Sequence, residues 1–284
     1  MTDFSSIIEK LEGLQQQLEQ LKDDLGQLAA QPSLDALTPG LTPRIPVFVP
    51  SEALAEIVDG QETLEFPDCC AVGNTLGFYC TGTLIAPNLV VTADHCDGAT
   101  RVFLNGNDIS KPNEGETIAV LHQLEHPEVD LRILILEHPA TVKPRSIAQG
   151  AEIQQTKSAM VVGFGTINTE GTVGYGIKRK LAKEIPITSI SCSDPTDPKK
   201  YGCLPGRELV AGHRGLRADT CRGDSGGPLY IKNASGEYLL LGATSRGVKN
   251  GFTTCGDGGV YVRVDLCVDW IEQVTGVKLG GSST

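Results

Sequence analysis

The chain has 284 residues, of which 24 are Lys or Arg and 35 are Asp or Glu, so its formal net charge is −11. A balance this acidic argues against nucleic-acid binding, and no run of about 18 apolar residues is present that would span a membrane as a helix. The 33 glycines and 16 prolines, spaced between many short apolar runs, favour a mostly β body.

Residues 1–31 predict an amphipathic helix. Apolar residues recur there at alternating steps of three and four, which is the heptad pattern of a coiled coil. They are Phe4, Ile7, Leu11, Leu14, Leu18, Leu21, Leu25 and Leu28. Two interpretations stay open, because the pattern is short and contains Gly13 and Gly26. The helix either lies on the rest of the chain, or it self-associates or docks to a partner helix.

Residues 32–56 predict a tether that ends in a propeptide. The segment is rich in residues that keep a chain extended and semi-rigid. These are Pro32, Pro39, Gly40, Pro43, Pro46 and Pro50. Residues 57–275 are then long enough to form one large or two small hydrophobic cores. We expect residues 276–284 to form a flexible tail.

Two apolar runs predict buried strands with a chemically useful residue at one end. The run 84–91 stops shortly before His95, and Asp130 directly precedes the alternating run 131–136. A histidine in such a place can act as a general base, and a carboxylate can hold its tautomer and stabilise its protonated form. We therefore nominate His95 and Asp130. The other histidines lack such flanks and are interpreted as surface or loop residues: His122, His126, His138 and His213.

The segment 221–229 reads Cys-Arg-Gly-Asp-Ser-Gly-Gly-Pro-Leu and sets Ser225 among glycines. A serine hydroxyl becomes a useful nucleophile when a base, an orienting group and oxyanion donors surround it. The same letters also fit the nucleophile elbow of α/β-hydrolases, in which the acid and the histidine follow the serine. All five histidines precede Ser225. The remaining order is His, Asp, Ser.

Residues 92–96, 130–136 and 221–229 together resemble the three signature segments of trypsin-like serine proteases, which have the chymotrypsin fold. Smaller marks extend the likeness over roughly residues 57–275: Gly163-Phe164-Gly165, Gly259-Val260-Tyr261 and Val268-Asp269-Trp270-Ile271. The resemblance implies an all-β fold of two six-stranded antiparallel β-barrels with a C-terminal helix. It also implies a serine endopeptidase that uses His95, Asp130 and Ser225 without a cofactor or a metal.

The resemblance assigns further roles around Ser225. The N–H groups of Gly223 and Ser225 would form the oxyanion hole. Asp219, six residues before the nucleophile, would lie at the base of the primary pocket, where a buried carboxylate selects a basic side chain. We therefore expect protein or peptide substrates that are cut after Arg or Lys. The alternative is that Asp219 pairs internally with Arg217. The other predicted pocket residues are Thr220, Ser245, Arg246, Gly247 and Gly259.

Arg246 departs from the family pattern, because an aromatic residue is common at that position. Arg222 adds a second positive charge next to the proposed oxyanion amide. We expect these two charges to favour acidic residues on the acyl side of the scissile bond.

Activation is predicted to depend on Asp224. In the family this acid binds the N-terminal amine that zymogen cleavage releases, and Ile57-Val58-Asp59-Gly60 resembles such a new N-terminus. The cut would follow Glu56, which an enzyme selective for Arg or Lys should not make itself. Either a protease with acidic specificity cuts there, or the enzyme is switched on without a cut.

The nine cysteines predict three disulfides. The resemblance pairs Cys80 with Cys96 and Cys221 with Cys255, and closeness in the chain alone pairs Cys192 with Cys203. The three others, Cys69, Cys70 and Cys267, leave at least one odd thiol. Side chains of strand neighbours point to opposite faces, so one of Cys69 and Cys70 could be buried and the other accessible.

Localisation stays open between two compartments. Paired cysteines are typical of oxidising compartments and so favour a secreted protein. The start Met1-Thr2-Asp3-Phe4 lacks the pattern of a secretory signal, which favours the cytoplasm.

Overall fold

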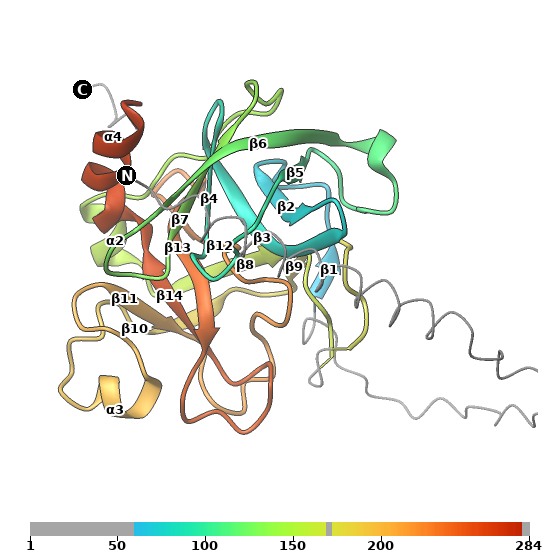
Figure 1. Cartoon of the computed structure of the whole chain (residues 1–284). Coiled ribbons are helices and arrows are strands. Elements are labelled where there is room, and N and C mark those ends of the chain that lie inside the picture. Colours follow the sequence, from blue (N-terminus) through green and yellow to red (C-terminus); the bar gives the residue numbers. More distant parts are fainter. Residues whose placement is uncertain (1–59, 169–171, 280–284) are drawn as a thin grey trace, which may run out of the picture. The chain divides into compact units, whose positions relative to one another are not determined.

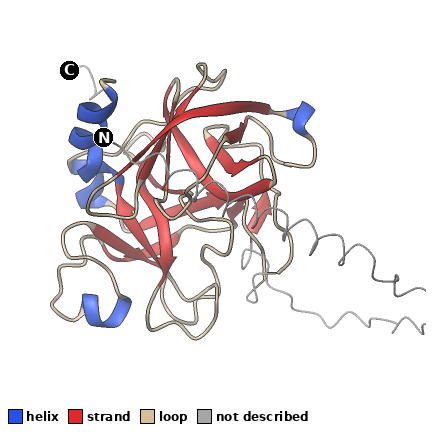
Figure 2. Ribbon diagram, in the orientation of Figure 1, coloured by secondary structure: helices blue, strands red, loops and turns tan. Residues whose placement is uncertain are grey.

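The computed structural model describes residues 60–168 and 172–279, and Figure 1 shows their course. The predicted helix of residues 1–31, the tether of residues 32–56 with Glu56, and Ile57 lie outside the described residues. Strands are the main regular elements of what is described, and short helices lie at its edges (Figure 2). No helix among these residues is long and apolar enough to cross a membrane.

The first barrel is a closed antiparallel sheet with the strand order β2-β3-β4-β7-β6-β5. Its strands are β2 (Cys69–Asn74), β3 (Gly77–Ala86), β4 (Leu89–Thr92), β5 (Arg101–Leu104), β6 (Glu116–Glu125) and β7 (Arg132–Leu136). Every second residue of these strands points inward, which is the period-2 pattern of a sheet with one buried face. Val72, Leu84, Val90 and Leu134 are fully buried in the cluster that fills the barrel.

The second barrel has the strand order β8-β10-β11-β14-β13-β12 and closes by a pairing of β12 with β8. Its strands are β8 (Ser158–Gly163), β10 (Ile185–Ser189), β11 (Glu208–Ala211), β12 (Pro228–Lys232), β13 (Tyr238–Gly247) and β14 (Gly259–Arg263). β9 (Arg179–Leu181) pairs with Val162 and Gly163 at the end of β8, and β1 (Gly60–Glu62) pairs with β9. The expected fold of two six-stranded barrels is confirmed.

The two barrels share one core. A single cluster of buried residues runs from Val91 and Phe103 of the first barrel to Val161 and Leu229 of the second. Polar groups also join the barrels: the Asp68 carboxylate, which is 1% exposed, binds the Arg145 guanidinium and accepts a hydrogen bond from Tyr230 Oη at 2.6 Å. Such a buried pair is stable only when both charges are matched.

The helices are short and peripheral. They are η2 (Pro112–Glu114), α2 (Ala151–Gln155), α3 (Asp197–Tyr201), η3 (Val264–Cys267) and α4 (Val268–Thr275). α4 buries Ile271 and ends at Gly276, whose φ of 70° is the left-handed conformation typical of a helix C-terminus. The chain then stays on the body as far as Leu279, which is 9% exposed and belongs to the shared core. The flexible tail of residues 276–284 stays a prediction, although Val277 and Leu279 pack against the core.

The three disulfides have the predicted partners: Cys80–Cys96, Cys192–Cys203 and Cys221–Cys255. Cys69 and Cys70 do point to opposite faces of β2, but both thiols are buried. Cys70 lies inside the first barrel and Cys69 lies in the core between the barrels. The expectation that one of them could be accessible fails because the second barrel covers the outer face of β2.

Candidate active site

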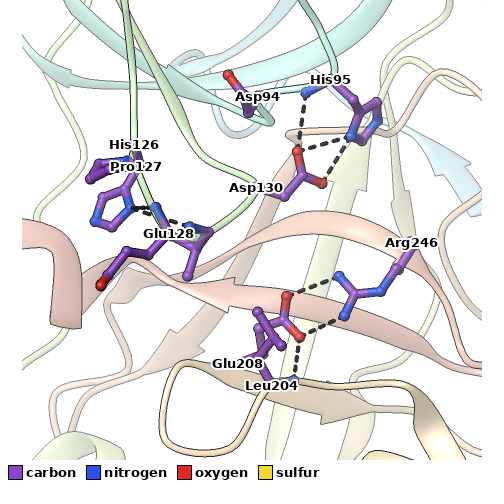
Figure 3. A pocket seen from close by; sticks show the side chains of 10 residues that line it. Asp94, His95, His126, Pro127, Glu128, Asp130, Leu204, Glu208 and Arg246 are labelled. Atoms are coloured by element: carbon purple, nitrogen blue, oxygen red, sulfur yellow. Dashed lines mark hydrogen bonds and ion pairs between the residues drawn. The ribbon is translucent and has the colours of Figure 1, made fainter.

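His95 and Asp130 lie together because their strands pair. β4 and β7 are antiparallel with Thr92 opposite Arg132, so the residues after β4 meet those before β7. The Nδ1 atom of His95 lies 2.9 and 3.1 Å from the two carboxylate oxygens of Asp130 (Figure 3). The backbone N–H of His95 also donates to Asp130 Oδ1 at 3.1 Å. The carboxylate therefore fixes both the ring and the turn that carries it.

Asp130 is held in its ionised form. Its Oδ2 atom accepts a hydrogen bond from Ser245 Oγ at 2.6 Å. Burial acts to raise the pKa of Asp130, but the hydrogen bonds from His95 and Ser245 outweigh burial and lower that pKa to about 2. The hydrogen bond to Asp130 raises the pKa of His95 in turn. An ionised Asp130 keeps the proton on Nδ1 and leaves Nε2 of His95 as the basic atom.

Ser225 lies beside this pair. Its carbonyl oxygen accepts the N–H of Thr81 in β3 at 2.9 Å and lies 3.6 Å from Sγ of Cys96, the residue next to His95. Thr81 Oγ1 also donates to Gly223 O at 2.7 Å. β3 therefore holds the serine loop, residues 219–225, at two points. Within the described part of the chain Ser225 Oγ has no hydrogen bond. Bonds between a nucleophile and its base are often long until substrate binds.

The loop amides are divided between structural hydrogen bonds and free donors. The N–H groups of Asp224, Gly226 and Gly227 donate to carbonyl groups of the chain. Those of Gly223 and Ser225 have no acceptor among the residues that the structure describes. Gly223 has a φ of 94°, a conformation that favours glycine. Because backbone N–H groups rarely stay unbonded, these two free donors, one of them on Ser225 itself, are suited to bind a ligand oxygen.

Asp219 is a buried carboxylate, 2% exposed, whose Oδ1 atom accepts hydrogen bonds from Tyr261 Oη at 3.0 Å and Thr220 Oγ1 at 3.3 Å. No ion pair reaches it from any described residue, and Arg217 is not its partner. Burial raises the pKa of Asp219 to about 7. Gly259 makes room for the Tyr261 side chain, because a Cβ there would lie 2.9 Å from Tyr261 Oη.

Asp224 is also fully buried. Its two carboxylate oxygens accept the N–H groups of Gly165 and Cys221, each at 2.8 Å. A Cβ would lie 2.0 Å from Oδ1 if placed on Gly163 and 2.6 Å if placed on Gly165, so the two glycines make room for the acid. Burial raises the pKa of Asp224 to about 6. No described Lys or Arg forms an ion pair with it.

Arg246 faces a different partner from the one expected. Its guanidinium binds both carboxylate oxygens of Glu208, at 2.9 and 2.7 Å. The two side chains border a hollow of about 450 Å³ beside His95 and Asp130, lined on its other side by the loop 126–129 (Figure 3). Because Glu208 neutralises Arg246, this arginine does not support the expected preference for acidic residues. Arg222 is exposed on its loop.

The sequence reasoning missed several residues that build the site. Thr81 and Glu208 carry no sequence signal, because their roles depend on which strands pair. Tyr261 lay inside a segment already singled out, but its hydroxyl was not linked to Asp219. Among the described residues, no three or more His, Cys, Asp or Glu side chains lie close enough to hold a metal ion.

Comparisons with known proteins agree with this geometry, which is that of a serine hydrolase on two β-barrels. The family model described as trypsin matches residues 57–271. A trypsin of Saccharopolyspora erythraea is 32% identical over 211 residues, which cover 69% of this chain and 87% of that protein. The chain therefore belongs to the trypsin family, and it is a serine endopeptidase.

A solved structure supports the fold independently. Neuropsin, a serine protease expressed in the limbic system of mouse brain, superposes with a TM-score of 0.62. The match covers 76% of this chain and 98% of that chain at 24% identity.

Proposed function

We propose that this endopeptidase cuts peptide bonds after Arg or Lys, with Ser225 as nucleophile, His95 as general base and Asp130 as the orienting carboxylate. One observation carries the proposal. In a single loop, residues 219–225, one serine lies close in sequence to a buried carboxylate that no described residue pairs with and to two amides that have no described acceptor. The carboxylate is suited to a cationic side chain and the amides to a developing oxyanion.

The chemistry follows from the positions of the donors and acceptors. Ser225 Oγ attacks the scissile carbonyl carbon while Nε2 of His95 takes the hydroxyl proton, and the N–H groups of Gly223 and Ser225 bind the new oxyanion. Collapse of the tetrahedral intermediate breaks the C–N bond, and His95 gives its proton to the leaving amine. Water then attacks the acyl-enzyme with His95 again acting as base, which frees the acid product and restores Ser225.

Asp219 supplies the selectivity. A guanidinium or ammonium group entering the pocket would provide the cation that no described residue provides, and it would favour the ionised form of the acid. A neutral side chain of similar size would leave the carboxylate buried without a partner, which is costly. Thr220, Ser245, Gly247 and Gly259 would form the walls of this pocket and the strand along which substrate lies.

Asp224 supplies the switch. Cleavage after Glu56 would free the amine of Ile57, which would pair with this buried acid and hold the serine loop in its active form. An enzyme selective for Arg or Lys does not cut after Glu, so a protease with acidic specificity is the expected activator. Activation without a cut is the alternative.

The N-terminal segment is a separate proposal from its sequence pattern. Residues 1–31 would form a helix that self-associates or docks to a partner helix, joined to the protease by residues 32–56.

The test uses the full chain before and after cleavage that leaves Ile57 as the new N-terminus. We expect small Arg and Lys amides to be hydrolysed only after the cut, and Ser225→Ala to abolish that turnover. Turnover that survives Ser225→Ala would overturn the mechanism. A cleaved enzyme that prefers amides of neutral residues would overturn the selectivity, and the appearance of Ile57 after simple self-incubation would overturn the proposed activator.

A further inference from the structure

A chain of hydrogen bonds runs from Glu208, at the start of β11, to the carboxylate beside His95. Arg246 binds Glu208 with two N–H groups, and its Nη1 also donates to Ser245 Oγ at 2.8 Å. Ser245 Oγ donates to Asp130 Oδ2 at 2.6 Å. Figure 3 shows the two ends of this series of hydrogen bonds, which are the pair of Arg246 with Glu208 and the pair of Asp130 with His95.

The guanidinium of Arg246 is held firmly. Besides its bonds to Glu208 and Ser245, Nη2 donates to Gly202 O at 2.6 Å. Glu208 is 0% exposed and also accepts the N–H of Leu204 at 2.7 Å. Arg246 is the only described cation that pairs with this acid. The side chain is therefore fixed from the protein interior and does not depend on a substrate for its position.

The direction of these hydrogen bonds is determined by the hydroxyl group of Ser245, which lies between Arg246 and Asp130. Ser245 Oγ has one proton, and its oxygen already accepts an N–H of Arg246, so the proton is directed to Asp130. A hydroxyl that accepts a hydrogen bond from a cation becomes a stronger donor. The positive end of the Arg246 and Glu208 pair thus faces Asp130, and the negative end lies in the interior.

We propose that Arg246 is a positioning residue for the hydrolysis: acting through Ser245 it fixes and polarises Asp130, and Glu208 offsets its charge so that His95 stays a competent base. This inference rests on the proposed roles of His95, Asp130 and Ser225. It gives Arg246 a role in the chemistry rather than the expected role in attracting acidic substrates.

The electrostatic consequence has a definite sign. Charged and titratable groups facing His95 come from its own turn (Asp94 and Asp97), from Asp130, from Arg132 of β7, which binds Asp94, and from the walls of the hollow. Those wall groups are His126, Glu128, Glu208 and Arg246. Removing the Arg246 charge would raise the pKa of His95, and removing the Glu208 charge would lower it. The acid limb of kcat/KM reports this ionisation in the free enzyme.

The experiment compares pH profiles of the full chain after cleavage before Ile57, using a small capped arginine ester that does not reach the hollow. Arg246→Gln should move the acid limb to higher pH and lower kcat about 10-fold with little change in KM. Glu208→Gln should move the limb to lower pH, and its kcat should fall less than that of Arg246→Gln, because the amide oxygen still accepts an N–H of Arg246. Arg246→Lys should leave the limb close to that of the unaltered enzyme, but with reduced kcat, because one ammonium cannot reach both Ser245 and Glu208.

A matched control is Arg263→Gln. Arg263 forms a similar pair with Asp265, at 2.6 Å for each of two bonds, but has no connection to Asp130. We expect the acid limb of the Arg263→Gln variant to lie at the same pH as that of the unaltered enzyme. The proposal would be overturned if the acid limbs of the Arg246→Gln and Glu208→Gln profiles stay in place. It would also be overturned if both limbs move in the same direction.

Two further comparisons keep the test decisive. If Arg246→Gln does not fold, Glu208→Gln alone decides: a shift to lower pH supports the proposal and an unmoved limb overturns it. Turnover by the unaltered enzyme and its loss in Ser225→Ala test the proposed function separately, so the failure of one is distinguishable from the failure of the other.

Discussion

Two groups of buried carboxylates differ in what neutralises them. Asp68 and Glu208 each bind an arginine through both oxygens, Asp68 to Arg145 and Glu208 to Arg246. Asp219 and Asp224, in the serine loop, are as deeply buried, but no ion pair reaches them from the described residues.

This difference indicates two kinds of role, a structural role for the paired acids and a functional role for the unpaired ones. A buried charge is tolerated when a partner matches it, and an unmatched one is destabilising. Burial raises the pKa of Asp219 to about 7 and that of Asp224 to about 6. Perturbed acids of this kind are characteristic of functional sites. The matched acids stabilise the fold, Asp68 between the barrels and Glu208 within the second one, and we propose that the unmatched acids are sites for a cation.

The largest expected effect is the loss of activity when Asp219 is replaced. In the cleaved enzyme Asp219→Asn should lower kcat/KM for Arg and Lys substrates roughly 10⁴-fold, because the group that binds the substrate cation is lost. Its free energy of unfolding should not fall, since a buried charge is removed. Steady-state kinetics and urea unfolding check both statements, with the exposed acid change Asp269→Asn as control. Undiminished turnover of Arg substrates would contradict the assignment.

Asp224→Asn comes next. The cleaved enzyme should lose about 10²- to 10³-fold in kcat/KM, the effect of removing one member of a buried ion pair. The uncleaved chain should lose little stability, because no described residue forms an ion pair with Asp224. The measurement is kcat/KM before and after the cut. The same activity in the variant and the unaltered enzyme after cleavage would rule out Asp224 as the switch.

Breaking a matched pair should have the opposite pattern. Arg145→Met should lower the free energy of unfolding by about 3 kcal/mol, because Asp68 is left buried without its cation. The kcat of the molecules that remain folded should hardly change. Urea unfolding and active-site titration check this, with the exposed change Lys143→Met as control. A variant of undiminished stability would show that Asp68 is less dependent on its arginine than its burial indicates.

The last expected effect is a pH dependence of stability, which does not change activity. Because the folded-state pKa of Asp219 is raised from 3.8 to about 7, folding favours its protonated form. That contribution is present at low pH and is lost as pH rises through about 7. The uncleaved Asp219→Asn variant should therefore gain stability relative to the unaltered chain between pH 4 and 7, as followed by urea unfolding. A constant difference across this range would contradict the raised pKa.

Much of the site could be predicted because its residues sit in local patterns. The ends of two apolar runs located His95 and Asp130, and the glycine-flanked serine located the loop 219–225. The partners across the fold could not be predicted. Glu208 and Arg246 are 38 positions apart and meet only because β11 and β13 both pair with β14. Pairing of this kind depends on strand register, which no short segment encodes.

The other differences have similar causes. Cys69 is buried because a second barrel covers its strand, and Leu279 is packed because the core extends past α4. Both facts depend on neighbours that are distant in sequence. Period-2 alternation indicates that one face of a strand is buried, but it does not indicate what covers the opposite face.

The central claim is that Asp219 is kept without a partner so that a substrate cation can bind it. The most direct measurement is the ratio of kcat/KM for an arginine amide to that for the citrulline amide, which has the same shape without the charge, in the cleaved enzyme and in Asp219→Asn. We predict a ratio on the order of 10⁴ that falls to near one in the variant. A ratio that is the same in both proteins would contradict the account.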